Sequence, residues 1–162
     1  MIKNRGNTTH NKLLKVSSSA FKNNMQMPGK YSRGGKNINP PFAIKSIPVT
    51  AKTLVIIMVN TNAPYGRRLH WMVWNLPVTH KIKAGEVPGK FGLNDFGSRQ
   101  YCGPFIKSHA NYTFKIYALD CVLKKIDKNI TKYKLERAMA GHITAYGEIT
   151  GSFGGEIPVT II

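Results

Sequence analysis

The segment Thr53–Val59 (TLVIIMV) constrains the fold of this chain more than any other part of the sequence. It is apolar and largely β-branched at both alternating sets of positions, which predicts a strand buried on both faces. A second apolar, aromatic run, His70–Leu76 (HWMVWNL), follows after a turn and stops at Pro77. The longest purely apolar run, Leu54–Val59, has six residues, far fewer than the roughly 20 that span a bilayer. We therefore expect a domain built around a buried sheet.

Further segments have the alternation of half-buried strands. Tyr112–Leu119 and Ile143–Ile149 alternate between two faces, and Lys12–Val16 suits a short first strand. Residues 22–41 and 78–104 are rich in Gly, Pro and Asn and are expected to form loops. A chain with four or more strands and few helical patterns favours a mainly β fold.

One helix is predicted near residues 131–140. Thr131 can cap its first turn, and Gly141 suits the left-handed residue that follows a helix. Its apolar face would be formed by Leu135, Ala138 and Met139. The length of 162 residues and the 42% hydrophobic content suit one domain over residues 12–162. The polar, basic residues 1–11 are expected to form a mobile tail.

Positive charge is concentrated in the first half of the chain. Lys and Arg number 24 against seven Asp and Glu, so the net charge is +17. No acidic residue precedes Glu86. Such a field attracts polyanions, which include nucleic acid, anionic membranes and phosphorylated partners. The alternative is a charge that serves solubility alone, because no nucleic-acid-binding motif accompanies it.

Catalytic and metal-binding patterns are lacking in the sequence. It contains no nucleophile elbow, phosphate-binding Walker loop, His-Glu-x-x-His or dinucleotide fingerprint. Cys102 and Cys121 are expected to be free thiols, with one disulfide as the alternative. Cys102 with His109 is a weak nucleophile pair. We therefore expect no enzyme activity, metal or cofactor. Residues 1–15 lack the apolar stretch of a secretion signal, which favours a cytoplasmic location.

Two loop regions are candidate sites. His70 heads the strand that follows the turn after Asn60; it can donate to an anion or shuttle a proton, or it can bond a backbone carbonyl. The Gly103-Pro104 turn, next to Asn94–Gly97, is expected to leave backbone amides free for an anion, or to be a plain turn. His142, after the predicted helix, is interpreted as a packed, hydrogen-bonded core histidine.

Many short motifs occur in the order typical of one family, over about residues 12–153. They are Ser18–Phe21, Met27–Tyr31, Asn37–Pro41, Ile47-Pro48, Asn60–Pro64, His70–Pro77, Gly92–Gly97, Tyr101–Pro104, Tyr112–Asp120 and Leu135–His142. Each motif is weak alone, but their number and order are specific. The chain resembles the phosphatidylethanolamine-binding protein family, in particular its bacterial and archaeal Raf kinase inhibitor-like branch.

The resemblance implies a fold and a site. The fold is a large central β-sheet packed on a smaller sheet, with a few short flanking helices. The site is a small pocket that binds anions such as phosphate, acetate or a phospholipid headgroup. Carried over by position, its residues are Asn60, Asn62, Pro64, His70, Gly103, Pro104 and Tyr112, and His109 lies one step from the place of a second pocket histidine, which Ala110 occupies.

The chain departs from the family pattern at two carboxylates. Asn60 and Asn62 stand where the family has aspartates. A carboxylate repels a bound anion, so the two amides favour phosphate by roughly one to a few kcal/mol. The alternative is that a family aspartate orients His70, in which case its loss blurs the site.

Two classes of function follow. The first is a module that binds a phosphate-bearing small molecule or phospholipid headgroup, and that regulates an acidic or phosphorylated protein in the manner of kinase- or protease-inhibiting relatives. The second is a basic surface that holds nucleic acid or anionic membrane by charge alone, beside a decayed pocket. The resemblance also allows a homodimer.

Overall fold

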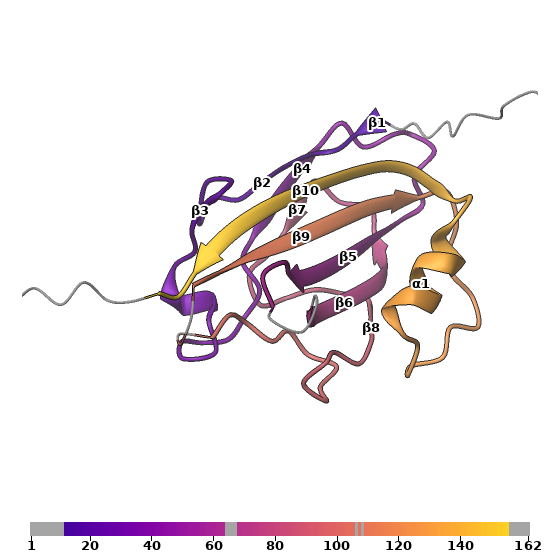
Figure 1. The fold of residues 1–162 in the computed structure, drawn as a ribbon. Helices are drawn as coiled ribbons and strands as arrows, with labels where there is room; N and C mark the ends of the chain where they lie inside the picture. Colours follow the sequence, from indigo (N-terminus) through magenta and orange to yellow (C-terminus); the bar gives the residue numbers. More distant parts are fainter. Residues whose placement is uncertain (1–11, 64–67, 106, 108, 156–162) are drawn as a thin grey trace, which may run out of the picture.

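A large, twisted sheet runs through the centre of the molecule in a computed structural model that describes residues 12–63, 68–105, 107 and 109–155 (Figure 1). Its strands are β1 (Lys12–Leu13), β3 (Met25–Gln26), β5 (Thr53–Asn60), β6 (Arg68–Pro77), β8 (Lys90–Phe91), β9 (Ala110–Leu119) and β10 (Ile143–Phe153). Their order is β1-β10-β9-β5-β6-β8, with β3 also paired to β10. The long strands β5, β6, β9 and β10 are antiparallel neighbours.

A smaller sheet covers one face of the large one. It consists of β2 (Lys15–Ser17), β4 (Phe42–Lys45) and β7 (Lys81–Ile82), in the order β2-β4-β7. Phe42 and Ile44 of this sheet share one apolar core with Leu54, Ile56 and Met58 of β5. A short 3-10 helix, Gly29–Tyr31, adds Tyr31 to the same core.

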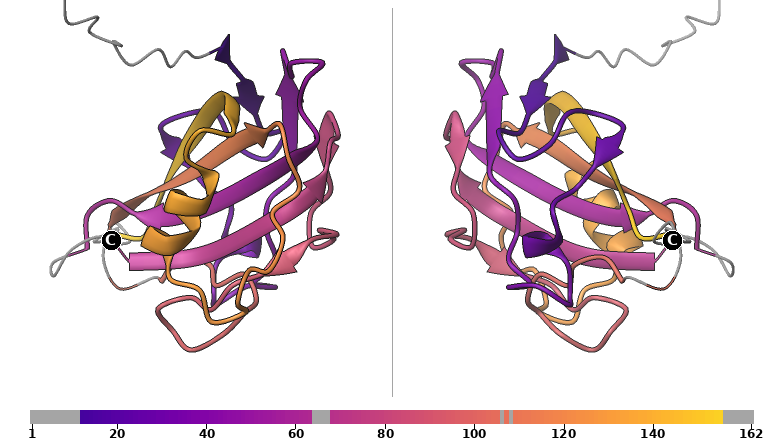
Figure 2. Two further views of the ribbon diagram at one scale, coloured as in Figure 1. Left: turned by 90° about the vertical axis from the view of Figure 1, so that its right-hand side faces the viewer. Right: turned by 90° about the vertical axis from the view of Figure 1, so that its left-hand side faces the viewer.

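The helix α1 (Lys132–Met139) covers the opposite face of the large sheet (Figure 2). Leu135 and Met139 pack with Val55 and Ile57 of β5 in a second core. The side chain of Thr131 accepts the backbone N–H of Lys134 at 3.2 Å, which caps the first turn. Gly141 has φ +82°, a conformation that glycine adopts readily. The predicted helix, with its cap and its end, is thus confirmed.

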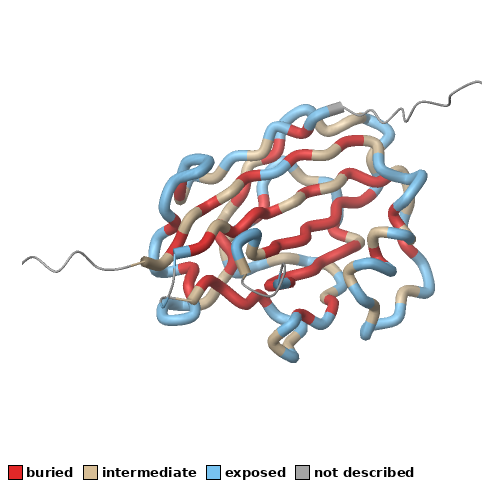
Figure 3. Tube along the Cα trace, viewed as in Figure 1, coloured by how far each residue is buried: buried red, intermediate tan, exposed pale blue. Residues whose placement is uncertain are grey.

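Strand β5 is buried along its length because both faces of the sheet are covered (Figure 3). Its side chains alternate between the core under the smaller sheet and the core under α1. Truncating a fully buried residue such as Ile57 to alanine would cost about 2–5 kcal/mol of unfolding free energy. The predicted two-faced burial of Thr53–Val59 is confirmed.

A β-bulge in β6 places His70. Met58 pairs with Trp71, but the next residue of β5, Val59, pairs with Leu69, so His70 is an extra residue on β6. Such bulges change the direction of a side chain and are frequent beside functional sites. The bulge therefore orients His70 differently from a regular strand position.

The predicted mainly β fold, with a large and a smaller sheet, is confirmed. The predicted first strand is two strands, because Leu14 enters the core where the chain passes from the large sheet to the smaller one. The predicted loops contain the short strands β3, β7 and β8. The predicted tail, residues 1–11, lies outside the described residues. None of the described helices has the length and apolar content needed to cross a membrane.

Candidate functional site

His70 is the centre of the candidate site. Its ring is fully buried, and Nδ1 lies 2.7 Å from the carbonyl oxygen of Cys102. A carbonyl oxygen only accepts hydrogen bonds, so Nδ1 carries the proton that is donated. In the neutral ring, Nε2 is therefore a bare acceptor.

The Nε2 atom of His70 has no hydrogen-bond partner. It is the one buried side-chain nitrogen or oxygen in this situation among the described residues. Leaving a buried polar atom unpaired costs about 1–3 kcal/mol. Native proteins rarely keep such an atom without a reason, and a ligand that supplies the missing bond is one such reason.

Three aromatic rings surround His70. Ring centroids lie 4.8 Å away for Phe96, 5.1 Å for Tyr112 and 6.0 Å for Phe105, all in edge or T-shaped contacts. Tyr112 is buried, whereas Phe96 and Phe105 are half-buried. The ring of His70 therefore lies in an apolar environment with two side chains that reach the surface.

Two arginines stack on these aromatic rings. The guanidinium of Arg33 lies 4.3 Å from the centroid of Phe105 and 5.6 Å from that of Phe96. The guanidinium of Arg68 lies 5.8 Å from Phe96. Among the described residues, neither guanidinium forms an ion pair. Both cations therefore remain able to attract an anion.

Burial lowers the pKa of His70 below its ordinary value, because the apolar surroundings disfavour the charged ring. The carbonyl of Cys102, the carboxylate of Asp95 and the backbone of Gly103 act in the opposite direction, and the charge of Arg33 lowers the pKa further. The neutral ring is thus the resting form at neutral pH.

The loop after β8 is tied to the strand that carries His70. Asn94 donates to the carbonyls of His70 and Gln100, and its side-chain oxygen accepts two amides of its own loop. Asp95 accepts the amide of Leu69 at 2.7 Å and donates its own amide to the Leu69 carbonyl. These bonds hold Phe96 against His70.

The backbone amide of Gly103 is not free, which corrects the prediction for this turn. It donates to the side-chain oxygen of Asn37 at 2.7 Å. The amide of Cys102 is also bonded, to the carbonyl of His70 at 3.2 Å, and Pro104 accepts the amide of Arg33. Gly103 and Pro104 are buried and form a wall of the site. Because the Gly103 N–H already donates to Asn37, it is not available to an anion.

Asn60 and Asn62 lie at the end of β5, next to Tyr112. Register pairs Asn60 with Tyr112 and with Arg68. The Asn60 side-chain oxygen accepts the Asn62 amide at 2.9 Å, and that of Asn62 accepts the Asn111 amide at 2.7 Å. A carboxylate can make both bonds, so the amides keep the turn and remove two negative charges. Cys102, not Asn60, orients His70.

Of the remaining predicted site residues, Tyr112 lies against His70 and His109 is exposed. Tyr112 contacts His70, and burial raises its pKa, an effect that the backbone of Phe105 partly offsets. His109 is exposed just before β9, and Ala110 after it is buried. Pro64 lies outside the described residues.

Comparison with known proteins assigns the family. The family model "Phosphatidylethanolamine-binding protein" matches residues 17–154. The chain belongs to the phosphatidylethanolamine-binding protein family. A UPF0098 protein of Pyrococcus horikoshii is 41% identical, over 86% of this chain and 76% of that protein. A UPF0098 protein of Chlamydia trachomatis is 36% identical, over 86% of this chain and 98% of that protein.

Two solved structures of this family have the same fold. A phosphatidylethanolamine-binding protein homologue from Chlamydia trachomatis superposes with a TM-score of 0.83, at 34% identity over 89% of this chain and 99% of its own. YbcL of E. coli superposes with a TM-score of 0.77, over 90% of this chain and 100% of its own. At 21% identity, the second likeness concerns the fold alone.

The Nε2 atom of His70 is buried in this family member. Two clefts of the described residues have volumes of about 630 Å³ and 580 Å³. The first is lined by Trp71, Tyr101, Lys90, Arg99 and their neighbours, and His70 lines neither. Because Nε2 is buried, a ligand reaches it only when a neighbouring group moves.

Sequence reasoning missed several residues of the site. Arg33 and Asn37 come from the loop before β4, more than 30 positions from His70 in the sequence. Phe105 lies just beyond the Tyr101–Pro104 motif. None belongs to a local pattern with His70, because their contacts arise only from tertiary packing.

Other predictions concern side chains away from His70. Both thiols are free, as expected, and burial raises the pKa of Cys102, which disfavours the reactive thiolate. The interpretation of His142 as a core residue is wrong: it is exposed and bonded to Asp120 at 2.9 Å. The turn at Gly141 carries it to the surface instead.

Proposed function

We propose that this chain binds a phosphate-bearing ligand at His70. The observation that carries the proposal is the unpartnered Nε2 atom in a fully buried ring. Arg33 and Arg68, stacked on the neighbouring phenylalanines, supply positive charge. Membership of the phosphatidylethanolamine-binding protein family supports a ligand of this class.

The tautomer of His70 defines how a phosphate binds. Because Nδ1–H is committed to Cys102, neutral His70 accepts at Nε2 and pairs with a protonated P–OH group. A fully ionised phosphate instead requires protonated His70, which donates from Nε2. The second pKa of a phosphate monoester is about 6, close to that of histidine. One proton between the phosphate oxygen and Nε2 therefore makes the hydrogen bond in both cases, whether the ligand or the ring carries it.

Because Nε2 of His70 is buried, we expect ligand entry to move one of the aromatic side chains around it. Phe105 and Phe96 are half-buried, whereas Tyr112 is buried and belongs to the main core. Phe105 follows the buried Pro104 and lies under Arg33. Rotation of Phe105 would bring Arg33 and Nε2 to the same ligand, so binding and opening would be coupled.

The competing function is charge-driven binding of nucleic acid or anionic membrane. The net charge of +17 favours it. Affinity of that kind falls steeply with salt and is insensitive to low concentrations of free phosphate. Binding at a buried histidine depends less on salt and is competed by phosphate.

Isothermal calorimetry with inorganic phosphate and O-phosphorylethanolamine, at two salt concentrations, tests the proposal. We expect saturable binding by the native chain and a loss of at least about tenfold in His70→Gln and Arg33→Gln. His80→Gln, an exposed histidine on another part of the chain, is the matched control. Absence of binding at low salt, or equal binding by all variants, would contradict the proposal and favour the basic surface.

A further inference from the structure

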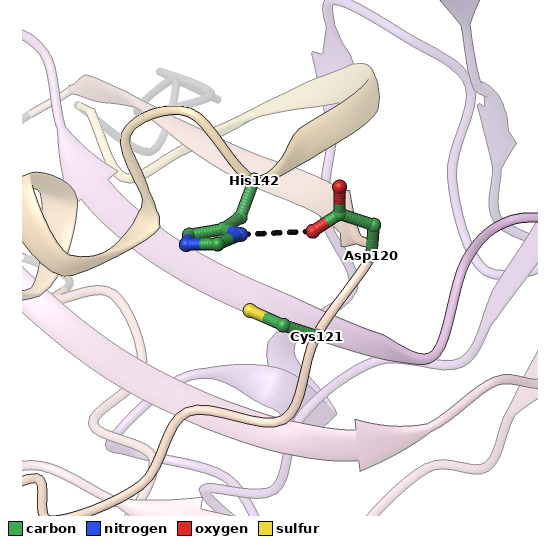
Figure 4. Close-up of side chains that lie close together, drawn as sticks. All are labelled: Asp120, Cys121 and His142. Atoms are coloured by element: carbon green, nitrogen blue, oxygen red, sulfur yellow. Dashed lines mark hydrogen bonds and ion pairs between the residues drawn. The ribbon is translucent and has the colours of Figure 1, made fainter.

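A second group of chemically reactive side chains lies at the far end of β9, where Leu119 leads into Asp120 and Cys121. His142, which directly precedes β10, meets them there (Figure 4). One donor atom from each of the three side chains lies within 4.8 Å of the others. Figure 4 shows the carboxylate, the thiol and the imidazole turned toward a common space.

We propose that Asp120, Cys121 and His142 bind a zinc ion. Thiolate, imidazole and carboxylate are the ligands that Zn²⁺ takes in proteins, and the combination with a thiolate disfavours Mg²⁺ and Ca²⁺. Zinc bonds of about 2.0–2.3 Å in a tetrahedron separate its ligands by about 3.3–3.6 Å. The Asp120 oxygen and His142 Nδ1, now 2.9 Å apart, would separate slightly, and donor atoms up to 4.8 Å apart would approach by about 1 Å, both through side-chain rotation.

The backbone already holds these residues together. The amide of Asp120 donates to the carbonyl of His142 at 2.9 Å, next to the pairing of Leu119 with Ile143. The buried Thr53 donates from its hydroxyl to the carbonyl of Cys121 at 2.7 Å. The positions of the three Cα atoms are thus fixed by β5, β9 and β10, which lowers the entropic cost of binding an ion.

The side chains remain accessible and free to rotate. The side chains of Asp120 and His142 are 44% and 47% exposed, and Cys121 is half-buried. An ion reaches them directly from solvent, and three protein ligands leave the fourth position to water.

The charge and proton balance are simple. Nδ1 of His142 now bonds Asp120 at 2.9 Å. When Nδ1 ligates the ion, its proton moves to the exposed Nε2, so the imidazole stays neutral. The Cys121 thiol loses one proton to the buffer. One thiolate and one carboxylate then neutralise the two charges of Zn²⁺.

The bound ion would clamp the turn after α1 to the end of β9. These segments are separated by more than 20 residues in the sequence. Zinc would therefore stabilise the native state by mass action, independently of any ligand at His70.

Calorimetry with Zn²⁺ on the full, tag-free chain in its reduced form tests the proposal. We expect one ion per chain. Binding should be at least about tenfold weaker in Cys121→Ser and in His142→Gln, because the loss of a residue that only hydrogen-bonds a metal ligand already weakens metal affinity about tenfold or more. Cobalt(II) should give a thiolate-to-metal absorption band that Cys121→Ser loses and Cys102→Ser keeps. Zinc should raise the melting temperature of the native chain, but not that of Cys121→Ser.

Two control variants, His80→Gln and His109→Gln, replace exposed histidines outside the cluster and should keep the affinity. Equal ellipticity spectra would establish that each variant folds. No zinc binding by the native chain overturns the proposal. Binding that both Cys121→Ser and His142→Gln retain within threefold, or a cobalt band that persists without Cys121, overturns it as well.

Discussion

The side-chain oxygen of Asn62 accepts the backbone amide of Asn111 at 2.7 Å and so ties the turn after β5 to the start of β9. Asn60 makes the equivalent bond to the amide of Asn62. Both bonds need only an acceptor, which aspartate also offers. The charge of this turn can therefore be changed without losing its hydrogen bonds.

The double variant Asn60→Asp, Asn62→Asp is expected to fold as the native chain and to bind phosphate about tenfold more weakly at low salt. Two added negative charges near the ligand cost on the order of 1–2 kcal/mol in a partly exposed site. Calorimetry with inorganic phosphate measures this change. Equal affinity would show that the ligand lies away from the turn.

A charge-matched control separates local repulsion from net charge. Lys124→Gln with Lys128→Gln lowers the net charge by the same two units, at exposed positions beyond the opposite end of β9. This variant should keep its phosphate affinity within about twofold. A drop as large as that of the aspartate variant would mean that long-range attraction dominates.

Anion binding should strengthen as the pH falls. Because Nδ1 of His70 is committed to Cys102, only the protonated ring donates from Nε2 to a fully ionised anion. Sulfate keeps its two charges throughout the range in which histidine titrates, so it isolates the ring. Burial lowers the pKa of His70, and above that pKa the sulfate affinity should fall by about tenfold per pH unit.

Calorimetric titrations with sulfate between about pH 8 and pH 5.5 follow this dependence. His70→Gln, which carries a permanent N–H donor, should bind with a nearly constant affinity over that range. A native affinity independent of pH would show that His70 does not contact the anion.

The same buried histidine makes the free protein less stable in mild acid. In the unfolded chain His70 takes up a proton below about pH 6.5, whereas burial lowers its pKa in the folded chain. The unfolded state therefore binds more protons, and stability falls as the pH decreases from about 6.5 toward the lowered pKa. Urea unfolding of the native chain and of His70→Gln should show a smaller loss in the variant; parallel losses would assign the effect to other groups.

Long, regular elements of this fold could be predicted, and pairwise contacts between loops could not. Strand β5 was recognised because burial on both faces removes polar residues from both alternating sets. Helix α1 was recognised from Thr131 and Gly141, whose roles are local. Two-residue strands such as β7 and β8 have no periodicity of their own, since they form only where another strand accepts them.

The candidate site divides in the same way. His70 and Tyr112 lie on the long strands β6 and β9 within recognisable motifs, and the structure brings them into contact. Arg33 and Phe105 are in contact because two loops pack together. Neither loop has a sequence pattern that predicts this packing. The Gly103 amide was expected to be free, but Asn37, 66 positions away, occupies it. Long-range hydrogen bonds of this kind depend on the complete fold.

We therefore expect Gly103 to support the site because it has no side chain, which lets the loop of Tyr31 and Ser32 pack closely against it. A Cβ at this position would lie 2.2 Å from the carbonyl oxygen of Tyr31 and 3.0 Å from Cα of Ser32, both backbone atoms that cannot rotate away. Gly103→Ala must push the Cys102 carbonyl and the loop of Arg33 apart. The expected cost is about 3 kcal/mol of unfolding free energy, the upper end of the range for overpacking.

Urea unfolding and phosphate calorimetry on Gly103→Ala measure both consequences. Because the Cys102 carbonyl fixes the His70 tautomer and Arg33 lies on Phe105, phosphate binding should be lost even under conditions in which the variant is folded. Gly29→Ala is the matched control: its Cβ would meet no atom within 4 Å, so stability should change by less than about 0.5 kcal/mol. A Gly103→Ala variant with native affinity would show that the wall formed by Gly103 does not position His70.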